Sequence, residues 1–361
     1  MILDSINIEN LRSLNKFNMQ FEPGINLIYG KNGKGKTSIL EAIYILSISR
    51  SFRSHFLRNI ITDGESNIKI IGKIKDSSNQ NLKIEYYKLN NQKRIKIDGK
   101  KINNLSDLLG VFPVTVLSPD DIDIITGNNK EKHKFFNTIL CHTNKVYLNY
   151  LKQYKTTIKQ RNALIRSNPT LEDIQIWNEK LSDLGEKIWC IRKDFFKHFI
   201  DIFNNLWSQI ECEFQANIAF NENQALSKKS YYNLLCNNHF NDIKVGYTTI
   251  GPHKDNIDLF FNNMPIKECG SQGEKKLFLI VLKIAEAIYI STIINKEPII
   301  LLDDLFAMLD KNRGAKVLKL LKQNYQIFIT TTDANAETYF TNMEQLNFIK
   351  LEECEQICFA A

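Results

Sequence analysis

One octapeptide near the start of the chain constrains its fold more than any other feature. Residues 30–37 read GKNGKGKT and match the pattern GxxxxGK[ST] at every fixed position. The apolar run at 25–29 before them predicts a strand, and the apolar spacing after them predicts a helix from Lys36 to about Ile48. A strand–loop–helix context is the one in which this pattern binds phosphate groups. A chance Gly/Lys-rich turn in a Lys-rich chain is the alternative.

The loop carries the chemistry that a nucleoside triphosphate needs. Its glycines let backbone N–H groups close around phosphates, while Lys36 neutralises the β and γ groups and Thr37 ligates Mg²⁺. The helix that follows adds the positive end of its dipole. We therefore expect ATP with Mg²⁺ as cofactors. The candidate nucleotide-binding residues of the loop are Gly30, Lys31, Asn32, Gly33, Lys34, Gly35, Lys36, Thr37 and Ser38.

A second acidic segment lies near the other end of the chain. Four apolar residues at 299–302 run directly into Asp303 and Asp304. A buried parallel strand that ends in carboxylates suits an α/β site, where ligands bind at the carboxyl edge of the sheet. We expect Asp303 to hold Mg²⁺, directly or through water, and Asp304 to polarise the attacking water. Asp304 and the phosphate-neutralising Lys36 are the expected catalytic residues. A core strand that ends in a solvated helix cap is the alternative; Asp310 and a predicted strand at 326–332 favour the site.

The spacing of these two segments indicates an insertion. Lys36 and Asp303 are 267 residues apart. Period-two patterns predict strands before about residue 118, and the last hundred residues alternate between helix and strand patterns. From 129 to 208 the apolar spacing is helical, and Asn168-Pro169 divides it into two expected long helices. The predicted fold is an α/β head with mixed sheets, formed by residues 1–118 and 246–361, with a mainly helical lobe at 119–245.

Composition excludes several other classes. Seven scattered cysteines without a CxxC pair argue against a disulfide framework or a structural zinc site. No run of about 18 apolar residues is present, so we expect a cytoplasmic protein with no membrane partner. The formal charge of +7 is compatible with a polyanionic partner but does not establish one.

A polar segment before the last long apolar stretch resembles the signature motif of ABC-type ATPases. Ser271-Gln272-Gly273-Glu274, here called the signature segment, opens an apolar helical pattern that leads to the acidic strand. In that class the signature of one subunit caps the γ-phosphate held by the loop of another. The resemblance implies that Ser271 and Gly273 contact nucleotide across an ATP-dependent homodimer, and that Asp310 belongs to the same site. An ordinary helix N-cap is the alternative.

Six further stretches narrow the likeness to the RecF family of bacterial recombination mediators. They occur in the family's order along the chain: residues 10–14, 37–44, 50–53, 117–121, 159–166 and 251–254. The resemblance implies an ABC-type P-loop ATPase head without a long coiled coil, and a weak, DNA-stimulated ATPase that uses Mg-ATP. It further implies binding to single-stranded, gapped or linear double-stranded DNA, work with RecO and RecR in loading recombinase, and support of the SOS response. Another SMC-like or ABC-type ATPase of DNA metabolism is the alternative.

Candidate DNA contacts remain open between two interpretations. Basic residues recur in three places, and each group either contacts phosphates or forms a solvated face. The groups are Lys130, Lys132, His133 and Lys134; Lys152, Lys155, Lys159, Arg161 and Arg166; and Arg50, Arg53, His55 and Arg58. Arg12 is either near the nucleotide or at the surface, and His253 is expected to be structural or close to the nucleotide.

Overall fold

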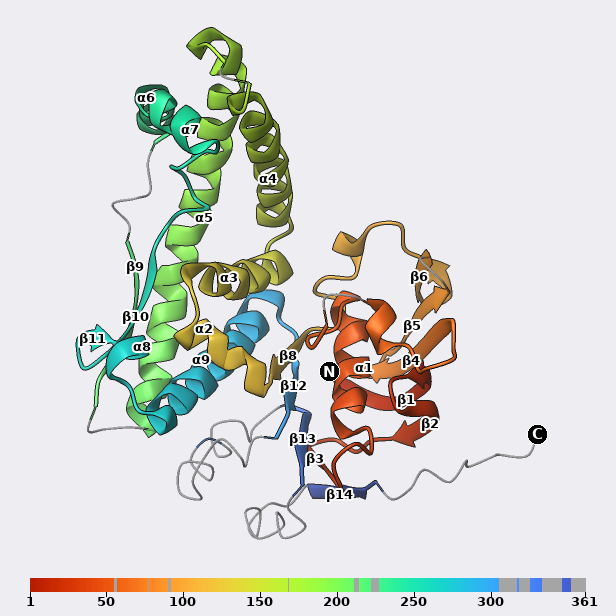
Figure 1. The fold of residues 1–361 in the computed structure, drawn as a ribbon. Coiled ribbons are helices and arrows are strands. Elements are labelled where there is room, and N and C mark those ends of the chain that lie inside the picture. The colour runs from red at the N-terminus through yellow and green to blue at the C-terminus, as the bar shows by residue number, and fades with distance from the viewer. Residues whose placement is uncertain are drawn as a thin grey trace. The chain divides into compact units, whose positions relative to one another are not determined.

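The computed structural model describes residues 1–54, 57–76, 78–89, 92–167, 169–210, 214–221, 227–304, 317, 325–332 and 346–351. Two compact units are present (Figure 1): unit 1 holds Met1–Asp123 and Ser271–Ala361, and unit 2 holds Ile124–Gly270. The sequence analysis expected the inserted lobe at 119–245, so the observed boundaries lie further along the chain. Residues 246–270 fall in unit 2 because β10 (Ile257–Phe261) pairs over its full length with β9 (Ala216–Phe220).

Unit 1 contains a five-stranded parallel sheet. Its spatial order is β14 (Leu346–Lys350), β3 (Ile25–Tyr29), β13 (Ile327–Thr331), β12 (Ile299–Leu302) and β8 (Val114–Leu117). Every residue of β8, β12 and β13 is buried, as is typical of parallel strands covered on both faces. Because the strands share one direction, their carboxyl ends meet at one edge. The expected phosphate loop follows β3 at that edge, and Asp303 follows β12.

A six-stranded antiparallel sheet forms the other layer of unit 1. Its order is β2 (Leu14–Gln20), β1 (Ile2–Leu11), β4 (Asn67–Lys75), β5 (Asn81–Leu89), β6 (Gln92–Ile97) and β7 (Lys100–Lys101). Helix α1 (Lys36–Ile48) contacts β1, β4 and β5 of this sheet and β8 and β13 of the parallel one. A Cβ on Gly72 of β4 would lie 2.6 Å from Cδ1 of Leu46, so a larger residue there would require the Leu46 side chain to shift. The expectation of mixed sheets is confirmed.

Helix α9 (Gln272–Ile294) continues the apolar core of unit 1 and contacts β8. Its N-cap is Ser271, and its apolar residues are buried from Leu277 through Leu282. Within the described residues, α9 alone is long and apolar enough to cross a membrane, and 72% of its most apolar window is buried inside the structure. A helix buried in a protein core can have the same length and hydropathy, so these two properties do not show that α9 crosses a membrane. Short helical turns lie at η1 (Leu57–Ile60), η2 (Leu105–Asp107) and η3 (Pro119–Ile122).

Unit 2 is mainly helical, as expected. The predicted helix pair is α4 (Lys145–Ile165) and α5 (Leu171–Ile210), which run side by side (Figure 1). A third helix, α3 (Asn129–Thr143), was not separated from α4 in the sequence analysis. The break falls at Asn144, whose side chain accepts a hydrogen bond from Tyr147 N and caps α4 without any Gly or Pro. The shorter elements are α2 (Asp123–Thr126), α6 (Lys228–Asn237), α7 (His239–Val245), α8 (Ile266–Cys269) and β11 (Met264–Pro265).

Two buried ion pairs hold unit 2 together. Arg161 is fully buried and donates to Asp242 at 2.7 Å and to Asn178 at 2.8 Å, so its interpretation as part of an exposed basic stripe is wrong. Arg192 pairs in the same way with Asp255 at 2.6 Å. Each buried charge is compensated by its ion-pair partner and by neutral hydrogen-bonding groups around it.

Two residues of the Lys130–Lys134 group also serve the interior of unit 2. Lys132 Nζ donates to the carbonyl oxygen of Ile257, and His133 Nε2 bonds the carbonyl oxygen of Asp255. Burial lowers the pKa of His133 to about 4, which keeps the ring neutral. His253 is structural as well, since its ring bonds the Tyr154 hydroxyl and the Thr248 carbonyl oxygen.

Candidate functional site

The loop at 30–35 adopts backbone conformations that only glycine takes readily. Gly30, Gly33 and Gly35 have φ of 154°, 81° and 93°. A Cβ on Gly30 would lie 2.8 Å from the carbonyl oxygen of Leu351, and one on Gly35 would lie 2.6 Å from Cδ2 of Leu14. Backbone conformation favours glycine at all three positions, and at Gly30 the backbone of Leu351 also leaves no room for a side chain. The loop turns the chain from the end of β3 into the N-terminus of α1, whose N–H groups are available to an anion.

The Lys36 side chain folds back over this loop. Its Nζ donates to the carbonyl oxygens of Gly30 at 2.6 Å and Lys31 at 2.9 Å, and the residue is 8% exposed. Burial lowers the pKa of Lys36, while the charges of Asp304 and Asp303 act in the opposite direction. The ammonium group is thus positioned inside the loop, next to the acidic edge of the sheet.

The parallel sheet brings Asp303 to the first turn of α1. Thr37 Oγ1 donates to Asp303 Oδ1 at 2.8 Å, and Thr330 Oγ1 donates to the same oxygen at 2.7 Å. Thr37 and Asp303 are 266 residues apart in the chain. In the sheet, β13 lies between β3, which leads into the loop and α1, and β12, which ends just before Asp303. The structure therefore brings together the two residues that the sequence analysis named as metal ligands. Hydroxyl and carboxylate oxygens are ligands that Mg²⁺ prefers, so the donor set fits that ion.

Asp304 lies beside this cluster in an unusual backbone conformation. Its φ is 54°, and its N–H donates to Thr330 Oγ1 at 3.0 Å. A left-handed aspartate costs about 1 kcal/mol or more, and it persists because the surrounding contacts hold it. Burial raises the pKa of the Asp304 carboxyl, the charge of Asp303 raises it further, and Lys36 lowers it. A carboxyl with a raised pKa is better matched to accepting a proton than an ordinary aspartate.

Thr330 is a site residue that the sequence analysis did not name. Its hydroxyl donates to Asp303 and accepts from the Asp304 N–H, so one side chain orients both acids. The available signal was the run Thr330-Thr331-Thr332 at the end of a predicted strand, which placed a hydroxyl at the carboxyl edge of the sheet. A single sequence does not show which strands are neighbours in a sheet. The run of threonines therefore did not indicate that Thr330 contacts Asp303 and Asp304.

The signature segment is exposed at the N-terminus of α9. Ser271 Oγ accepts from Glu274 N at 3.3 Å, and Glu274 Oε2 accepts from Ser271 N at 2.6 Å. This reciprocal pair is a capping box, which starts the helix. Ser271, Gln272 and Gly273 are all exposed to solvent. Asp310, expected in the same site, lies outside the described residues.

Arg12 is held by the helix that follows the phosphate loop. Its Nε and Nη2 donate to the two carboxylate oxygens of Glu41 at 2.6 and 3.0 Å, and Glu41 is fully buried. Ser51 Oγ also donates to Glu41. The β1–β2 turn and the segment after α1 are therefore tied to one buried carboxylate. Arg12 is therefore an ion-pair partner of α1 with a partly exposed side chain, and its expected position near the nucleotide stays a prediction.

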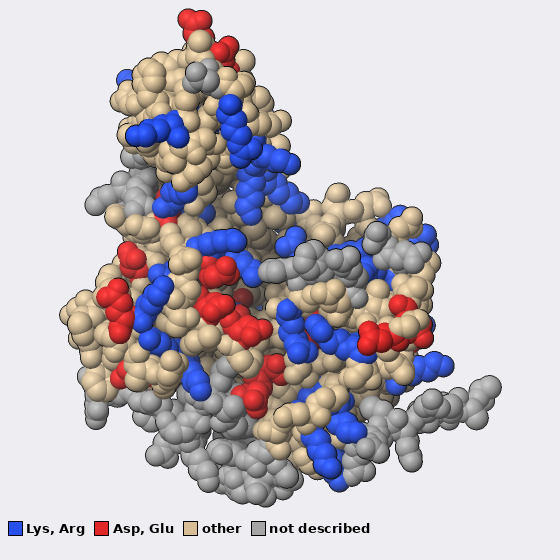
Figure 2. Space-filling view, in the orientation of Figure 1, with Lys and Arg blue, Asp and Glu red and all other residues tan. Residues whose placement is uncertain are grey.

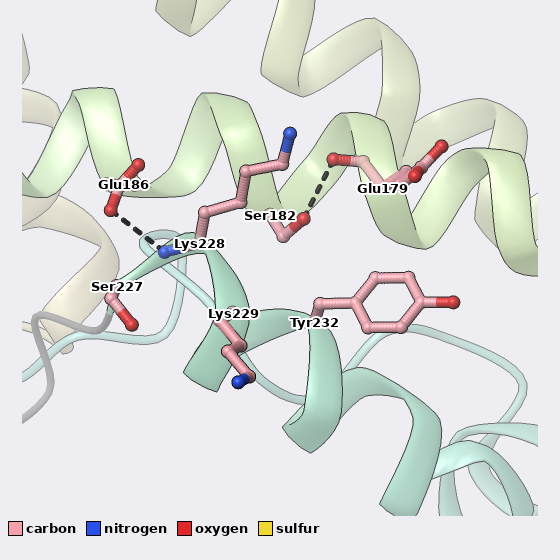
Figure 3. A pocket seen from close by; sticks show the side chains of 7 residues that line it. All are labelled: Glu179, Ser182, Glu186, Ser227, Lys228, Lys229 and Tyr232. Carbon is pink, nitrogen blue, oxygen red and sulfur yellow. Dashed lines mark hydrogen bonds between the residues drawn. The ribbon is translucent and has the colours of Figure 1, made fainter.

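A separate cavity of about 440 Å³ lies between α5 and α6 of unit 2 (Figure 3). Two of its polar side chains are engaged within the protein: Glu186 accepts from Lys228 N at 2.9 Å, and Ser182 Oγ donates to the carbonyl oxygen of Glu179. It contains charges of both signs and no nucleophile–base pair. We therefore do not assign it to the site. The described part of the chain also contains no group of three or more His, Cys, Asp or Glu side chains arranged to hold a metal.

Comparisons with known proteins identify the family. The model for the RecF/RecN/SMC N terminal domain matches residues 2–356. DNA replication and repair protein RecF of Chlamydia muridarum is 31% identical, with 97% of this chain and 99% of the relative covered. The RecF protein of Flavobacterium johnsoniae is 32% identical, with coverages of 92% and 94%.

Solved structures agree with these relatives. The recombination mediator protein RecF-ATP of the RecFOR pathway superimposes with a TM-score of 0.85 at 28% identity, covering 97% of both chains. The Smc head domain of Pyrococcus furiosus shares the fold, with a TM-score of 0.57 at 13% identity. The predicted ABC-type head fold is confirmed. This chain belongs to the RecF family of DNA replication and repair proteins.

Proposed function

We propose that this protein is a RecF-like, ATP-dependent DNA-binding protein of replication and recombinational repair. The observation that carries the proposal is the contact of Thr37 with Asp303 at 2.8 Å, beside Lys36 and Asp304. It joins the loop after β3 to the acidic end of β12, as a nucleotide site requires. The solved relative described as RecF-ATP supports ATP as the nucleotide.

Each residue of the cluster has a distinct role in this proposal. Lys36 leaves the carbonyl oxygens of Gly30 and Lys31 and binds the β- and γ-phosphates. Thr37 and Asp303 hold Mg²⁺, which would neutralise charge on the phosphates. Asp304 orients and deprotonates the attacking water, with Thr330 fixing its backbone. The remaining loop residues, Asn32 to Gly35 and Ser38, supply backbone or side-chain contacts to the phosphates.

The signature segment acts across a dimer. Ser271, Gly273 and the N–H groups of the first turn of α9 are exposed, so they are available to the γ-phosphate held by a second copy. Asp310 is assigned to the same composite site. ATP then forms part of the interface, and its binding free energy is coupled to association.

The family relationship supplies the biological setting of the proposal. DNA in single-stranded, gapped or linear double-stranded form is the substrate, and RecR and RecO are the partners, in keeping with the RecFOR pathway named for the solved relatives. The proposal places the protein in the cytoplasm and in support of the SOS response.

Sedimentation velocity tests the central part of this proposal. The full chain is measured alone, with ATP and Mg²⁺, and with a gapped DNA added. We expect a monomer alone, a dimer with ATP, and a larger complex with DNA. A chain that stays monomeric with saturating ATP contradicts the composite site, and one that never binds DNA contradicts the function.

A further inference from the structure

A long part of unit 2 lacks acidic residues altogether. Residues 132–171 contain no Asp or Glu, although 40 acidic residues in a chain of 361 predict about four in a stretch of this length. All of α4 falls in this stretch. Its lysines therefore have no acidic neighbour on the same helix, and the i,i+4 pairing that neutralises many exposed helices is missing.

The basic residues of α4 gather on its exposed side. The helix packs inward through Tyr147, Leu151, Tyr154 and Ile165. The exposed cations are spaced by seven, three, four and seven residues, which confines them to an arc of about 80° at 3.6 residues per turn. We call this set the α4 basic face; it consists of Lys145, Lys152, Lys155, Lys159 and Arg166. Figure 2 shows Lys and Arg side chains gathered over the part of unit 2 that contains α4.

Neighbouring elements leave this charge uncompensated. Within the described residues, no ion pair joins any member of the α4 basic face to an acid, whereas Lys187 of α5 pairs with Asp183 at 2.7 Å. The α4 basic face is therefore a concentrated positive surface that attracts an external polyanion.

The residues between the cations identify the kind of polyanion. Asn149, Gln153 and Gln160 are exposed next to the cations, and such side chains donate hydrogen bonds to phosphate oxygens. A membrane-binding helix instead presents large apolar side chains, and among the described residues α4 exposes only Val146. From Lys145 to Arg166 the helix extends about 31 Å at 1.5 Å per residue, which matches about nine base pairs of duplex at 3.4 Å each.

We propose that the α4 basic face binds the phosphate backbone of DNA. This inference rests on the proposed DNA-binding function and assigns part of it to a surface of unit 2. Contacts of this kind set affinity and its salt dependence but not sequence preference.

The test compares two triple variants of the full chain with matched charge changes. One is Lys152→Gln, Lys155→Gln and Lys159→Gln on α4. The control is Lys180→Gln, Lys193→Gln and Lys197→Gln, three exposed lysines on the acid-containing helix α5. Binding of a fluorescent duplex of about 30 base pairs, several times the length the face can span, is measured with ATP and Mg²⁺ over a series of salt concentrations.

Three lost phosphate contacts should reduce the slope of log K against log salt by about 2.7, at 0.9 per contact, and lower affinity at 0.1 M salt by at least about tenfold. The control should match the wild type, and all three proteins should melt at the same temperature. If the wild type binds DNA and the α4 variant keeps its slope and affinity, this inference fails while DNA binding stands on another surface.

Two other results also overturn the assignment. A variant that binds DNA normally but no longer binds polyglutamate identifies an acidic polypeptide as the occupant. If the wild-type protein binds neither duplex nor gapped DNA, both this inference and the proposed function are wrong.

Discussion

Removing the amino group of Lys36 should weaken ATP binding by about 100-fold or more. With ATP bound, Nζ exchanges the carbonyl oxygens of Gly30 and Lys31, at 2.6 and 2.9 Å, for phosphate oxygens. Two charge-assisted hydrogen bonds contribute roughly 1.5–3 kcal/mol each. Part of this is offset, because the wild-type protein must break the two hydrogen bonds to carbonyl oxygens first. A net loss of about 3 kcal/mol corresponds to about 10²-fold in Kd.

Titration of a fluorescent ATP analogue with Mg²⁺ measures this effect on Lys36→Ala. The control is Lys34→Ala, which removes a second ammonium group from the same loop at a position where the backbone is expected to bind. We expect the control to stay within a few-fold of wild type. If Lys36→Ala binds with wild-type affinity, the loop is not the nucleotide site. Equal losses in both variants would mean that general loop charge, and not the contacts of Nζ, controls affinity.

Three further outcomes are expected. Asp304→Asn should bind ATP normally but hydrolyse it about 10²-fold more slowly, and an unchanged rate would move the catalytic role, with Asp303 the first alternative. Ser271→Arg should leave ATP binding intact but block ATP-dependent dimerisation, and a variant that dimerises in light scattering refutes the signature assignment. Burial lowers the pKa of His253 to about 4. The unfolded chain, with a histidine pKa near 6.5, binds more protons below that pH, so stability should fall by up to about 3 kcal/mol as pH drops from about 6.5 to 4. Melting curves of His253→Asn should depend less on pH than those of the wild type; equal dependence would exclude this residue as the source.

Local features of the fold could be predicted well. The helix expected from Lys36 to about Ile48 is α1 as observed, and the strand expected at 25–29 is β3. Both depend on side-chain periodicity and on glycines within a few residues, which a sequence shows directly. The end of α3 could not be found in this way, because a side-chain cap from Asn144 replaces the usual Gly or Pro.

The sequence could not predict which individual charged side chains are buried. Lys159 and Arg161 are two residues apart in one basic stretch, yet Lys159 is exposed and Arg161 is fully buried against Asp242. Two positions on a helix differ by about 200° in direction, so one faces solvent when the other faces the interior. Which direction is inward depends on where α5 and the segment around Asp242 pack, and those contacts are distant in the sequence.

The sequence by itself determined the chemistry of the loop, the class of its ligand and the family, because these depend on residue types at short, fixed spacings. The tertiary structure alone decided that Thr37, Asp303 and Thr330 share one carboxylate oxygen. It also decided that Asp304 adopts a left-handed conformation held by Thr330. These contacts join the first turn of α1, the residues just after β12 and the end of β13. The order of strands in such a sheet is set by packing of the whole unit, not by any local pattern.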